Sequence, residues 1–346
     1  MRIVVLAGGT STERDVSLVS GKTVYRALKE NGHKVVLLDS FTGYPKDGYE
    51  DVFESDRQWD ENKVSIGSEG SNPESIKRER PGQGFFGPHV LSICQKADIV
   101  FMALHGINGE DGKVQSVFDL FGIKYTGCNP LGAAISMDKG VTKQLLRENG
   151  IPTPAGIVVK KGHEPPEECL PNPPIVVKAS NGGSSVGVYI VNTIEEYGES
   201  LQKAYRYDDE VVVEQCISGR EFSVGVIDGK ALPIIEIIPR NGLFNYNEKY
   251  HKGSAVEICP AELSPEKTQQ IMSYAEETCK VLHIDCYARI DFMMDAHENM
   301  YVLEANVLPG MTPTSLLPQE AAAMGMDFNS LCEYLIEVSL RKWKED

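Results

Sequence analysis

Apolar strand patterns and amphipathic helix patterns alternate along this chain, and this alternation constrains its fold more than any other feature. The run RIVVLA at residues 2–7 ends in glycines, and a helical pattern with Val16 and Leu28 near one face follows it, ending at Gly32. The next apolar run is KVVLLD at residues 34–39. Strands that alternate with helices in this way are typical of a parallel sheet covered by helices. The N-terminal segment therefore predicts an α/β fold with parallel strands.

The length of the chain predicts more than one domain, because 346 residues exceed what a single hydrophobic core normally holds. A second unit begins near Cys128, with a helix pattern that stops at Gly150 and the strand patterns PPIVVKAS and EVVVEQCI. A third begins near Ser218, with a hairpin that turns at Asp228–Gly229 and a helix capped by Ser264. We expect three units, at residues 1–127, 128–217 and 218–346, with most of 41–88 as surface loop.

The charge and the cysteines exclude several classes of partner and site. The net charge of −16 argues against a nucleic-acid groove and against binding to an anionic membrane surface. No apolar run approaches the ~20 residues of a membrane span, and no targeting segment is recognisable. The eight cysteines form no CxxC pair, which favours reduced thiols over disulfides or a zinc site. We therefore expect a cytoplasmic protein.

A lysine followed by a loop of small residues, KASNGGSSVG at residues 178–187, indicates a phosphate site. Phosphates need backbone N–H donors at close approach, which glycine allows, together with a cation. Lys178 supplies the cation, and Gly182 and Gly183 supply the flexibility. The order is reversed from a P-loop, in which the lysine follows the glycines. Taken alone, the loop could equally be a mobile turn.

Two late strand patterns carry polar side chains at a spacing of two. Arg289 and Asp291 lie in YARIDFMMD, and Glu304 and Asn306 lie in MYVLEANVLPG. Residues two apart on a strand face the same side of a sheet. Two carboxylates and an amide are hard oxygen ligands that suit Mg²⁺ beside nucleotide phosphates. A salt bridge at a sheet edge is the alternative interpretation.

Six motifs in order carry a family resemblance. KASNGGSSVGV, VVVEQCISGREFSV, RIDFMMD and EANVLPGMTPTSLLP resemble the successive motifs of ATP-grasp enzymes. With GGTSTERDVSLVSG and ALHGINGEDGKVQ, they resemble the D-alanine–D-alanine ligase family from about residue 3 to 332, most weakly between 41 and 88. The resemblance implies a three-domain ATP-grasp architecture with ATP between the central and C-terminal domains.

The activity that this resemblance implies is ligation of two D-alanines for peptidoglycan precursor synthesis. One D-alanine carboxylate attacks the γ-phosphate of ATP to give an acyl phosphate, and the amine of the second displaces phosphate. The family also implies a homodimer, with D-alanine and ATP as its small-molecule partners. The loop at 178–187 is expected to close over the phosphates and to exclude water from the acyl phosphate.

The resemblance also implies a set of site residues. The catalytic set is Glu13, Ser184, Tyr250, Arg289 and Gly310. Residues that bind the two substrates are His105, Ser315 and Leu316. Residues that bind the nucleotide are Lys139, Lys178, Ser185, Glu214, Glu221 and Lys249. The ligands for two Mg²⁺ ions, with Mn²⁺ as the alternative ion, are Asp291, Glu304 and Asn306. Within these sets, Arg289 and the Gly310 N–H would form an oxyanion site.

Four departures from the family pattern affect loops rather than these roles: Ala179, Asn245, Asn247 and Val307. Two alternatives stay open. One is a variant ligase that makes D-Ala-D-Lac or D-Ala-D-Ser, although Tyr250 and the apolar Leu316 favour D-alanine. The other is a catalytically silent ATP-binding regulator, which would not need both carboxylates of the metal site.

Overall fold

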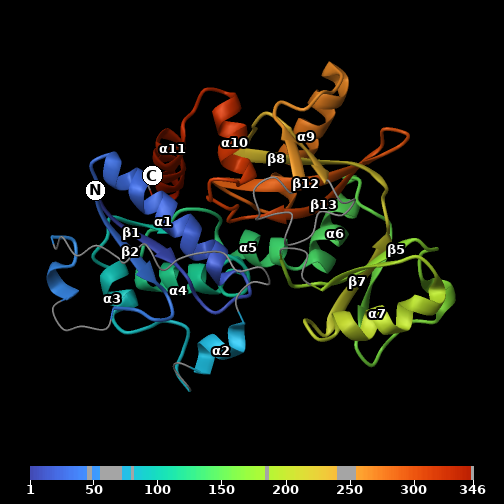
Figure 1. Ribbon diagram of the computed structural model, residues 1–346, viewed down its shortest axis with the longest axis horizontal. Coiled ribbons are helices and arrows are strands. Elements are labelled where there is room, and N and C mark those ends of the chain that lie inside the picture. Colours follow the sequence, from blue (N-terminus) through green and yellow to red (C-terminus); the bar gives the residue numbers. More distant parts are fainter. Residues whose placement is uncertain (45–48, 55–71, 79–81, 184–186, 240–254, 344–346) are drawn as a thin grey trace.

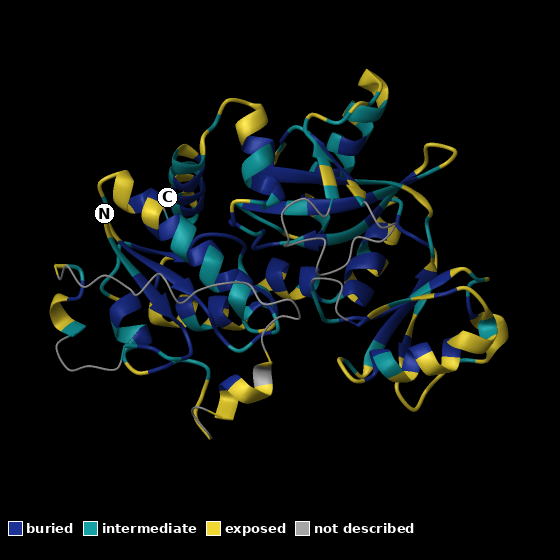
Figure 2. Ribbon diagram, viewed as in Figure 1, coloured by how far each residue is buried: buried dark blue, intermediate teal, exposed yellow. Residues whose placement is uncertain are grey.

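The computed structural model describes residues 1–44, 49–54, 72–78, 82–183, 187–239 and 255–343. Three sheets organise these residues: a parallel sheet, a four-stranded antiparallel sheet and a larger antiparallel sheet. Figure 1 shows the three sheets spread along the long axis of the molecule, with the larger antiparallel sheet between the other two. Figure 2 shows the buried residues concentrated in these sheets and in the helix faces against them.

The first sheet is parallel, in the order β2-β1-β3. Its strands are β1 (Arg2–Ala7), β2 (Lys34–Asp39) and β3 (Ile99–Met102). Helices α1 (Arg14–Glu30), α3 (Val90–Cys94) and α4 (Lys113–Phe121) cover it. Side chains alternate across a strand, so Ile3 and Val5 enter one hydrophobic core while Val4 and Leu6 enter another on the opposite face. Burial on both faces explains why RIVVLA is apolar at every position after Arg2.

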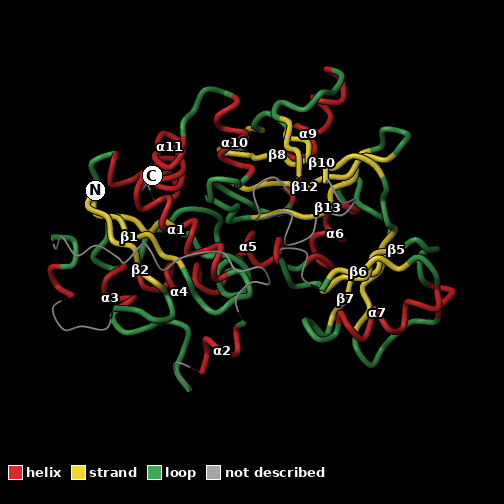
Figure 3. Tube along the Cα trace, viewed as in Figure 1, coloured by secondary structure: helices red, strands yellow, loops and turns green. Residues whose placement is uncertain are grey.

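The four-stranded sheet is antiparallel, in the order β4-β7-β5-β6. Its strands are β4 (Gly156–Lys160), β5 (Ile175–Ala179), β6 (Val188–Val191) and β7 (Glu210–Gln215), and α7 (Tyr197–Ala204) packs on one face, as Figure 3 shows. Two short 3₁₀ turns, Glu167–Cys169 and Ile194–Glu196, lie in its connections. Ile175 and Val177 point into this core, so the intervening Val176 and the following Lys178 face a cavity.

The larger sheet is antiparallel, in the order β11-β10-β8-β12-β13, with β9 paired to β8. Its strands are β8 (Gly219–Ile227), β9 (Lys230–Ala231), β10 (Ile235–Pro239), β11 (Ala255–Ile258), β12 (Tyr287–Asp295) and β13 (Met300–Asn306). Helix α9 (Pro265–Val281) covers one face, with the Ser264 hydroxyl accepting from Lys267 N at 3.2 Å. The turn between β8 and β9 has positive φ at both Asp228 and Gly229, as the Asp-Gly pair predicts.

Four helices join the sheets to one another. They are α5 (Pro130–Met137), α6 (Lys139–Glu148), α10 (Leu316–Ala323) and α11 (Phe328–Leu340), and a 3₁₀ turn follows at Arg341–Trp343. Leu146 of α6 packs into the core of the larger sheet, and Leu331 and Leu335 of α11 pack with Ile3 and Leu28 of the first unit. Figure 1 shows α11 beside α1. The residue limits of the three units remain a prediction. One hydrophobic core contains residues of the first and third units, and another contains residues of the second and third.

The segment 41–88 is only partly irregular. Among its described residues are a 3₁₀ turn at Tyr49–Asp51 and the short helix α2 (Pro73–Arg78). Phe85 and Phe86 pack against the core between the first sheet and α4. The polar composition of this segment did not indicate that Phe85 and Phe86 anchor it, because a loop needs only a few apolar side chains to pack against a core.

Candidate active site

Two cavities meet at the polar face of the larger sheet. The larger, of about 510 Å³, lies between the antiparallel sheets and is lined by Lys139, Lys178, Glu214 and strand residues of both. The smaller, of about 60 Å³, lies between the first unit and the larger sheet. Its lining includes Glu13, His105, Glu110, Arg289, Gly310, Ser315 and Leu316. Glu221, Asp291 and Glu304 line both cavities, so a molecule in one would meet a molecule in the other at these carboxylates.

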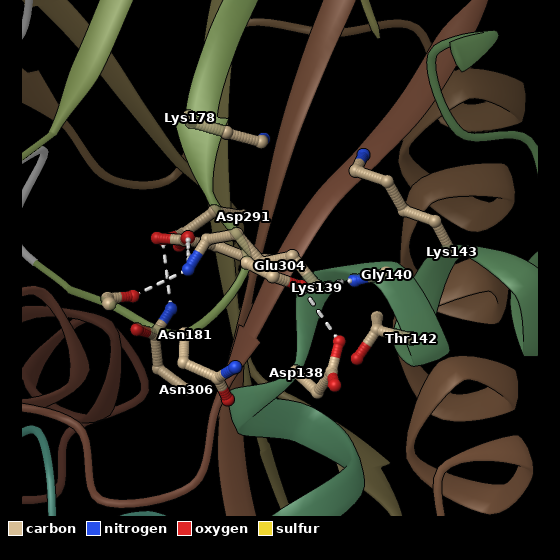
Figure 4. A network of polar contacts seen from close by, with 12 residues as sticks. Asp138, Lys139, Gly140, Thr142, Lys143, Lys178, Asn181, Asp291, Glu304 and Asn306 are labelled. Carbon is tan, nitrogen blue, oxygen red and sulfur yellow. Dashed lines mark hydrogen bonds and ion pairs between the residues drawn. The ribbon is translucent and has the colours of Figure 1, made fainter. Parts of the chain in front are cut away.

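The strand pairing places the predicted metal ligands together. Asp291 of β12 lies opposite Glu304 of β13, and Arg289 lies opposite Asn306. Asp291 accepts hydrogen bonds from Arg289 at 2.9 and 2.8 Å, from Asn306 Nδ2 at 3.0 Å and from the Ser223 hydroxyl at 2.8 Å. Figure 4 shows this carboxylate group and the helix start that brings Lys139 to it. The expected convergence of Arg289, Asp291, Glu304 and Asn306 on one sheet face is present.

Two lysines of α6 contact carboxylates of the site. Lys139 Nζ lies 3.3 Å from Glu304 Oε2 and donates to the Gly182 carbonyl. Lys143, one helical turn later, is buried and lies 2.6 Å from Glu214 Oε2. The Asp138 side chain caps α6 through Val141 N and accepts from the Ser180 hydroxyl, which joins the helix start to the strand that carries Lys178.

Glu214 is held between two ammonium groups. Lys178 Nζ lies 2.6 Å from Glu214 Oε1, on the side opposite Lys143, and Figure 4 shows both lysines pointing into the same space. Burial opposes ionisation of Glu214, but the ion pairs with Lys143 and Lys178 outweigh it and lower the pKa of this carboxyl. Burial also lowers the pKa of Lys143 to about 8, although Glu214 favours its charged form. The cavity wall therefore carries an ionised carboxylate whose charge is balanced by two lysines of the protein.

The smaller cavity brings together residues of the first unit and the larger sheet. Glu13 precedes α1 and is 6% exposed. A Cβ on Gly183 would lie 2.6 Å from Glu13 Oε2, so the loop that starts at Lys178 reaches the first unit, and glycine permits that approach. Ser315 precedes α10, and Leu316 packs with Ile235 and Ile237 to give the cavity an apolar wall.

Both ring nitrogens of His105 have partners in the protein. Nδ1 lies 3.1 Å from the Leu308 carbonyl oxygen, and Nε2 lies 3.0 Å from the Ser20 hydroxyl. Burial lowers the pKa of His105, which outweighs the opposite effect of Glu13. A neutral ring that donates from Nδ1 and accepts at Nε2 satisfies both contacts.

Four predicted site residues lie outside the described residues: Ser184, Ser185, Lys249 and Tyr250. Four further residues lie at the site but were not predicted from the sequence: Glu110, Lys143, Ser223 and Glu320. Lys143 had a signal, since it follows Lys139 at a spacing of four on a predicted helix and so lies on the same face. Ser223 sits opposite Asp291 in the β8–β12 pairing, which the sequence does not reveal.

Glu320 of α10 is a buried carboxyl behind the site. Its Oε2 accepts from Gly225 N at 2.8 Å, and Oε1 has no hydrogen-bond partner among the described residues. A Cβ on Gly225 would lie 2.4 Å from Oε2, so glycine is required on β8 for this approach. Burial raises the pKa of Glu320 to about 8, with Arg289 acting in the opposite direction.

We expect the unmodified protein to lose folding stability as the pH rises, and we expect Glu320→Gln to remove this part of the pH dependence. The folded carboxyl keeps its proton up to about pH 8, while the unfolded one releases it near 4.5, so folding weakens as the pH rises between these values. The full effect corresponds to at most roughly 5 kcal/mol. Melting temperatures at pH 5 to 8.5 should fall less steeply for Glu320→Gln than for the unmodified protein. Glu277→Gln, at an exposed position on α9, is the control. Parallel curves for all three proteins would contradict the prediction.

Two antiparallel sheets that enclose a cavity lined by lysine and carboxylate side chains define the ATP-grasp class of enzymes. The chain belongs to the D-alanine–D-alanine ligase family of that class. The family model described as D-ala D-ala ligase N-terminus matches residues 2–128, and the D-ala D-ala ligase C-terminus model matches residues 145–337. The resemblance and the α/β ATP-grasp fold expected from the sequence are thereby confirmed.

Relatives match along the whole chain. The D-alanine–D-alanine ligase of Pediococcus pentosaceus is 44% identical over 342 residues, which cover 97% of each sequence. That of Lacticaseibacillus casei is 41% identical over 351 residues, covering 100% of this chain and 97% of the relative. The crystal structure of the Bacillus anthracis ligase complexed with ATP matches with a TM-score of 0.75 at 33% identity, covering 99% of this chain and 97% of that chain. The structure of the Coxiella burnetii ligase matches with a TM-score of 0.76 at 28% identity, covering 99% and 94%.

Proposed function

We propose that this chain joins two D-alanines to D-alanyl-D-alanine, with conversion of ATP to ADP and phosphate, for peptidoglycan precursor synthesis. The observation that carries this proposal is the meeting of a larger and a smaller cavity at Glu221, Asp291 and Glu304. A ligase of this kind must bring a nucleotide phosphate and a substrate carboxylate to one point. Relatives named D-alanine–D-alanine ligase, matched along the whole chain, support the same reaction.

The larger cavity is the proposed ATP site. Lys139 and Lys178 would contact the phosphates, and Glu214 and Glu221 would contact adenine and ribose. Lys178 must then move from Glu214 to the phosphates, and Lys143 keeps the Glu214 carboxylate paired when it does so. Ser185 and Lys249 belong to the proposed phosphate site as well. The structure of the Bacillus anthracis relative complexed with ATP supports the assignment.

Asp291, Glu304 and Asn306 are the proposed ligands for two Mg²⁺ ions, or for Mn²⁺. Their fit is visible in the charge around them, since the guanidinium of Arg289 and the ammonium of Lys139 lie against the two carboxylates. Oxygen donors at one point of a sheet, already attracting cations, suit a hard divalent ion. When bound, Mg²⁺ reduces the repulsion between the triphosphate and the attacking carboxylate.

The smaller cavity is the proposed site for the reacting D-alanines. Glu13 would bind the ammonium group of the first, and Ser184 and Tyr250 would complete a hydrogen-bonded group with Glu13. His105 lies at the cavity wall. Ser315 and the Leu316 backbone would bind the carboxylate of the second. Arg289 and the Gly310 N–H would stabilise the oxyanion that forms when the second amine attacks the acyl phosphate.

The test of this function is product analysis. The purified chain is incubated with ATP, Mg²⁺ and D-alanine, with and without equimolar D-lactate, between pH 6 and 8. We expect D-Ala-D-Ala across this range, with phosphate released in step with the dipeptide and little D-Ala-D-Lac. Dominant D-Ala-D-Lac at pH 6 would assign the chain to the lactate-using variants. Phosphate release without either product would contradict ligation.

We also propose that the chain works as a homodimer in the cytoplasm. Leu120 and Phe121 end α4 with 87% and 49% exposure, which supplies apolar surface for a second copy. All eight cysteines are free thiols, which suits a reducing compartment. Within the described ranges, no helix combines the length and apolar character needed to span a bilayer. Light scattering of the unmodified chain and of Leu120→Glu would show whether a dimer forms through this surface.

A further inference from the structure

The backbone around Gly310 is held by the first unit at three points. Leu308 N donates to Glu110 Oε1 at 3.3 Å, and the Leu308 carbonyl lies 3.1 Å from His105 Nδ1. Met311 N donates to the Ser20 hydroxyl at 3.2 Å. These partners are 198, 203 and 291 residues away in the sequence. The segment 308–311 follows β13, yet its backbone hydrogen bonds are made by α1 and by the loop before α4.

The three partners form one connected network. Met311 N–H donates to the Ser20 oxygen, and the Ser20 O–H donates to His105 Nε2 at 3.0 Å. Because a carbonyl can only accept, His105 Nδ1 must carry the proton that it shares with Leu308. Glu110 Oε2 accepts from Gly106 N at 2.7 Å, which fixes this carboxylate to the loop that carries His105. Each polar group in the network has a complementary partner, so the network specifies one arrangement.

The burial of the network limits its alternatives. Ser20 is fully buried and His105 is 6% exposed, so water cannot readily replace either one. Leu308 and Met311 are also buried, at 3% and 4% exposure, on either side of Pro309 and Gly310. A backbone segment anchored on both sides of two residues leaves little freedom for the peptide between them.

We propose that Ser20, His105 and Glu110 are positioning residues that orient the Gly310 N–H toward the reacting centre. This inference rests on the oxyanion role of Gly310 in the proposed function. A peptide N–H stabilises a developing oxyanion only when it already points at the position that the oxygen will occupy. Gly310 has no side chain with which to fix its own peptide, so its neighbours must do so. The first unit thereby contributes to the transition state as well as to substrate binding.

The test uses Ser20→Ala and Glu110→Gln in the full chain. Ser20→Ala removes the link between Met311 and His105, and Glu110→Gln replaces one of the two oxygens that accept an N–H with an amide nitrogen, which cannot accept. We expect kcat to fall by about 10- to 100-fold in each variant, with KM for ATP within about twofold of the unmodified value. Ser116→Ala and Glu277→Gln, at exposed positions on α4 and α9, are the matched controls and should keep full activity.

A second readout separates positioning from a structural role. A phosphinate analogue of the dipeptide mimics the tetrahedral centre, so its affinity reports the oriented N–H. We expect its inhibition constant to rise in Ser20→Ala and Glu110→Gln by about the factor by which kcat falls. Unchanged analogue affinity with reduced kcat would overturn the proposal, as would full activity in both variants. If the unmodified chain makes no dipeptide, the proposed function fails and this inference fails with it. An active chain with unaffected variants would overturn this inference alone.

Discussion

Glu304→Gln is expected to reduce phosphate release by about 1000-fold or more while the protein stays folded. Glu304 lies opposite Asp291 across the β12–β13 pairing, and its carboxylate is 3.3 Å from Lys139 Nζ. The amide has nearly the same shape but carries no charge, so the site keeps its geometry and loses one of its two anionic ligands. A factor of 1000 corresponds to about 4 kcal/mol of transition-state stabilisation.

The measurement is phosphate release at saturating ATP and D-alanine over a series of Mg²⁺ concentrations. Melting temperatures without added Mg²⁺ establish that the variant is folded, and Glu277→Gln is the control for the substitution. A second assay counts Mn²⁺ ions bound in the presence of ADP, which should be fewer in Glu304→Gln. Turnover near the unmodified rate at saturating Mg²⁺ would rule out Glu304 as a metal ligand.

Arg289→Met is expected to lower kcat by about 100- to 1000-fold with a much smaller change in KM for ATP. Arg289 lines the smaller cavity, where the second amine would attack, and its side chain is 16% exposed. It also makes two hydrogen bonds to Asp291, so it could act through the metal site instead. Arg289→Lys distinguishes these roles, because it keeps the positive charge and loses the planar fork.

Varying the Mg²⁺ concentration decides between the two effects of Arg289. If Arg289 acts at the oxyanion, both variants keep a low kcat at saturating Mg²⁺. If it acts only by orienting Asp291, excess Mg²⁺ restores the rate. Arg341→Met is the matched control, since Arg341 pairs with Asp228 and Glu337 at the surface and such pairs contribute roughly 1 kcal/mol or less. A kcat within about threefold of the unmodified value in Arg289→Met would exclude the oxyanion role.

Local chemistry explains which parts of the site were predictable. Arg289 and Asp291 share a sheet face because side chains alternate along any strand, and the same rule applies to Glu304 and Asn306. Lys178 faces the cavity because Ile175 and Val177, at odd positions of the same strand, enter the core. These statements need only the period of a strand, which the sequence displays directly.

The ends of several helices and the hairpin turn can also be predicted from the sequence. Ser264 caps α9, Asp327 caps α11 through Ser330 N, and Asp228–Gly229 forms the predicted hairpin turn. Each depends on a side chain and a backbone group only a few residues apart. The helix predicted in MDKGVTKQLLRENG is present as α6, which begins after its Asp138 cap, whereas the preceding helix α5 was not predicted.

The pairing of Glu214 with Lys143 and Lys178 could not be predicted in the same way. Glu214 was expected to contact the nucleotide, and no pattern in the sequence indicated a buried lysine beside each of its carboxylate oxygens. The contact depends on how α6 packs against β7, which hydrophobic burial decides for the whole molecule. Burial is not directional, so it leaves no mark on the spacing of the charged residues themselves.

The sequence by itself determined the family, through six motifs in order along the chain. It also determined the order of strands and helices and the faces on which the chemical groups lie, because these depend on the spacing of residues within one element. Only the tertiary structure decided that α11 returns to the first sheet, that Glu320 accepts from the Gly225 N–H, and that Ser20, His105 and Glu110 hold the segment around Gly310. These contacts join residues far apart in the chain; the Asn31–Glu333 hydrogen bond between α11 and the first unit spans 302 positions. Their partners are fixed by the packing of three cores against one another, and no local pattern of residues encodes that packing.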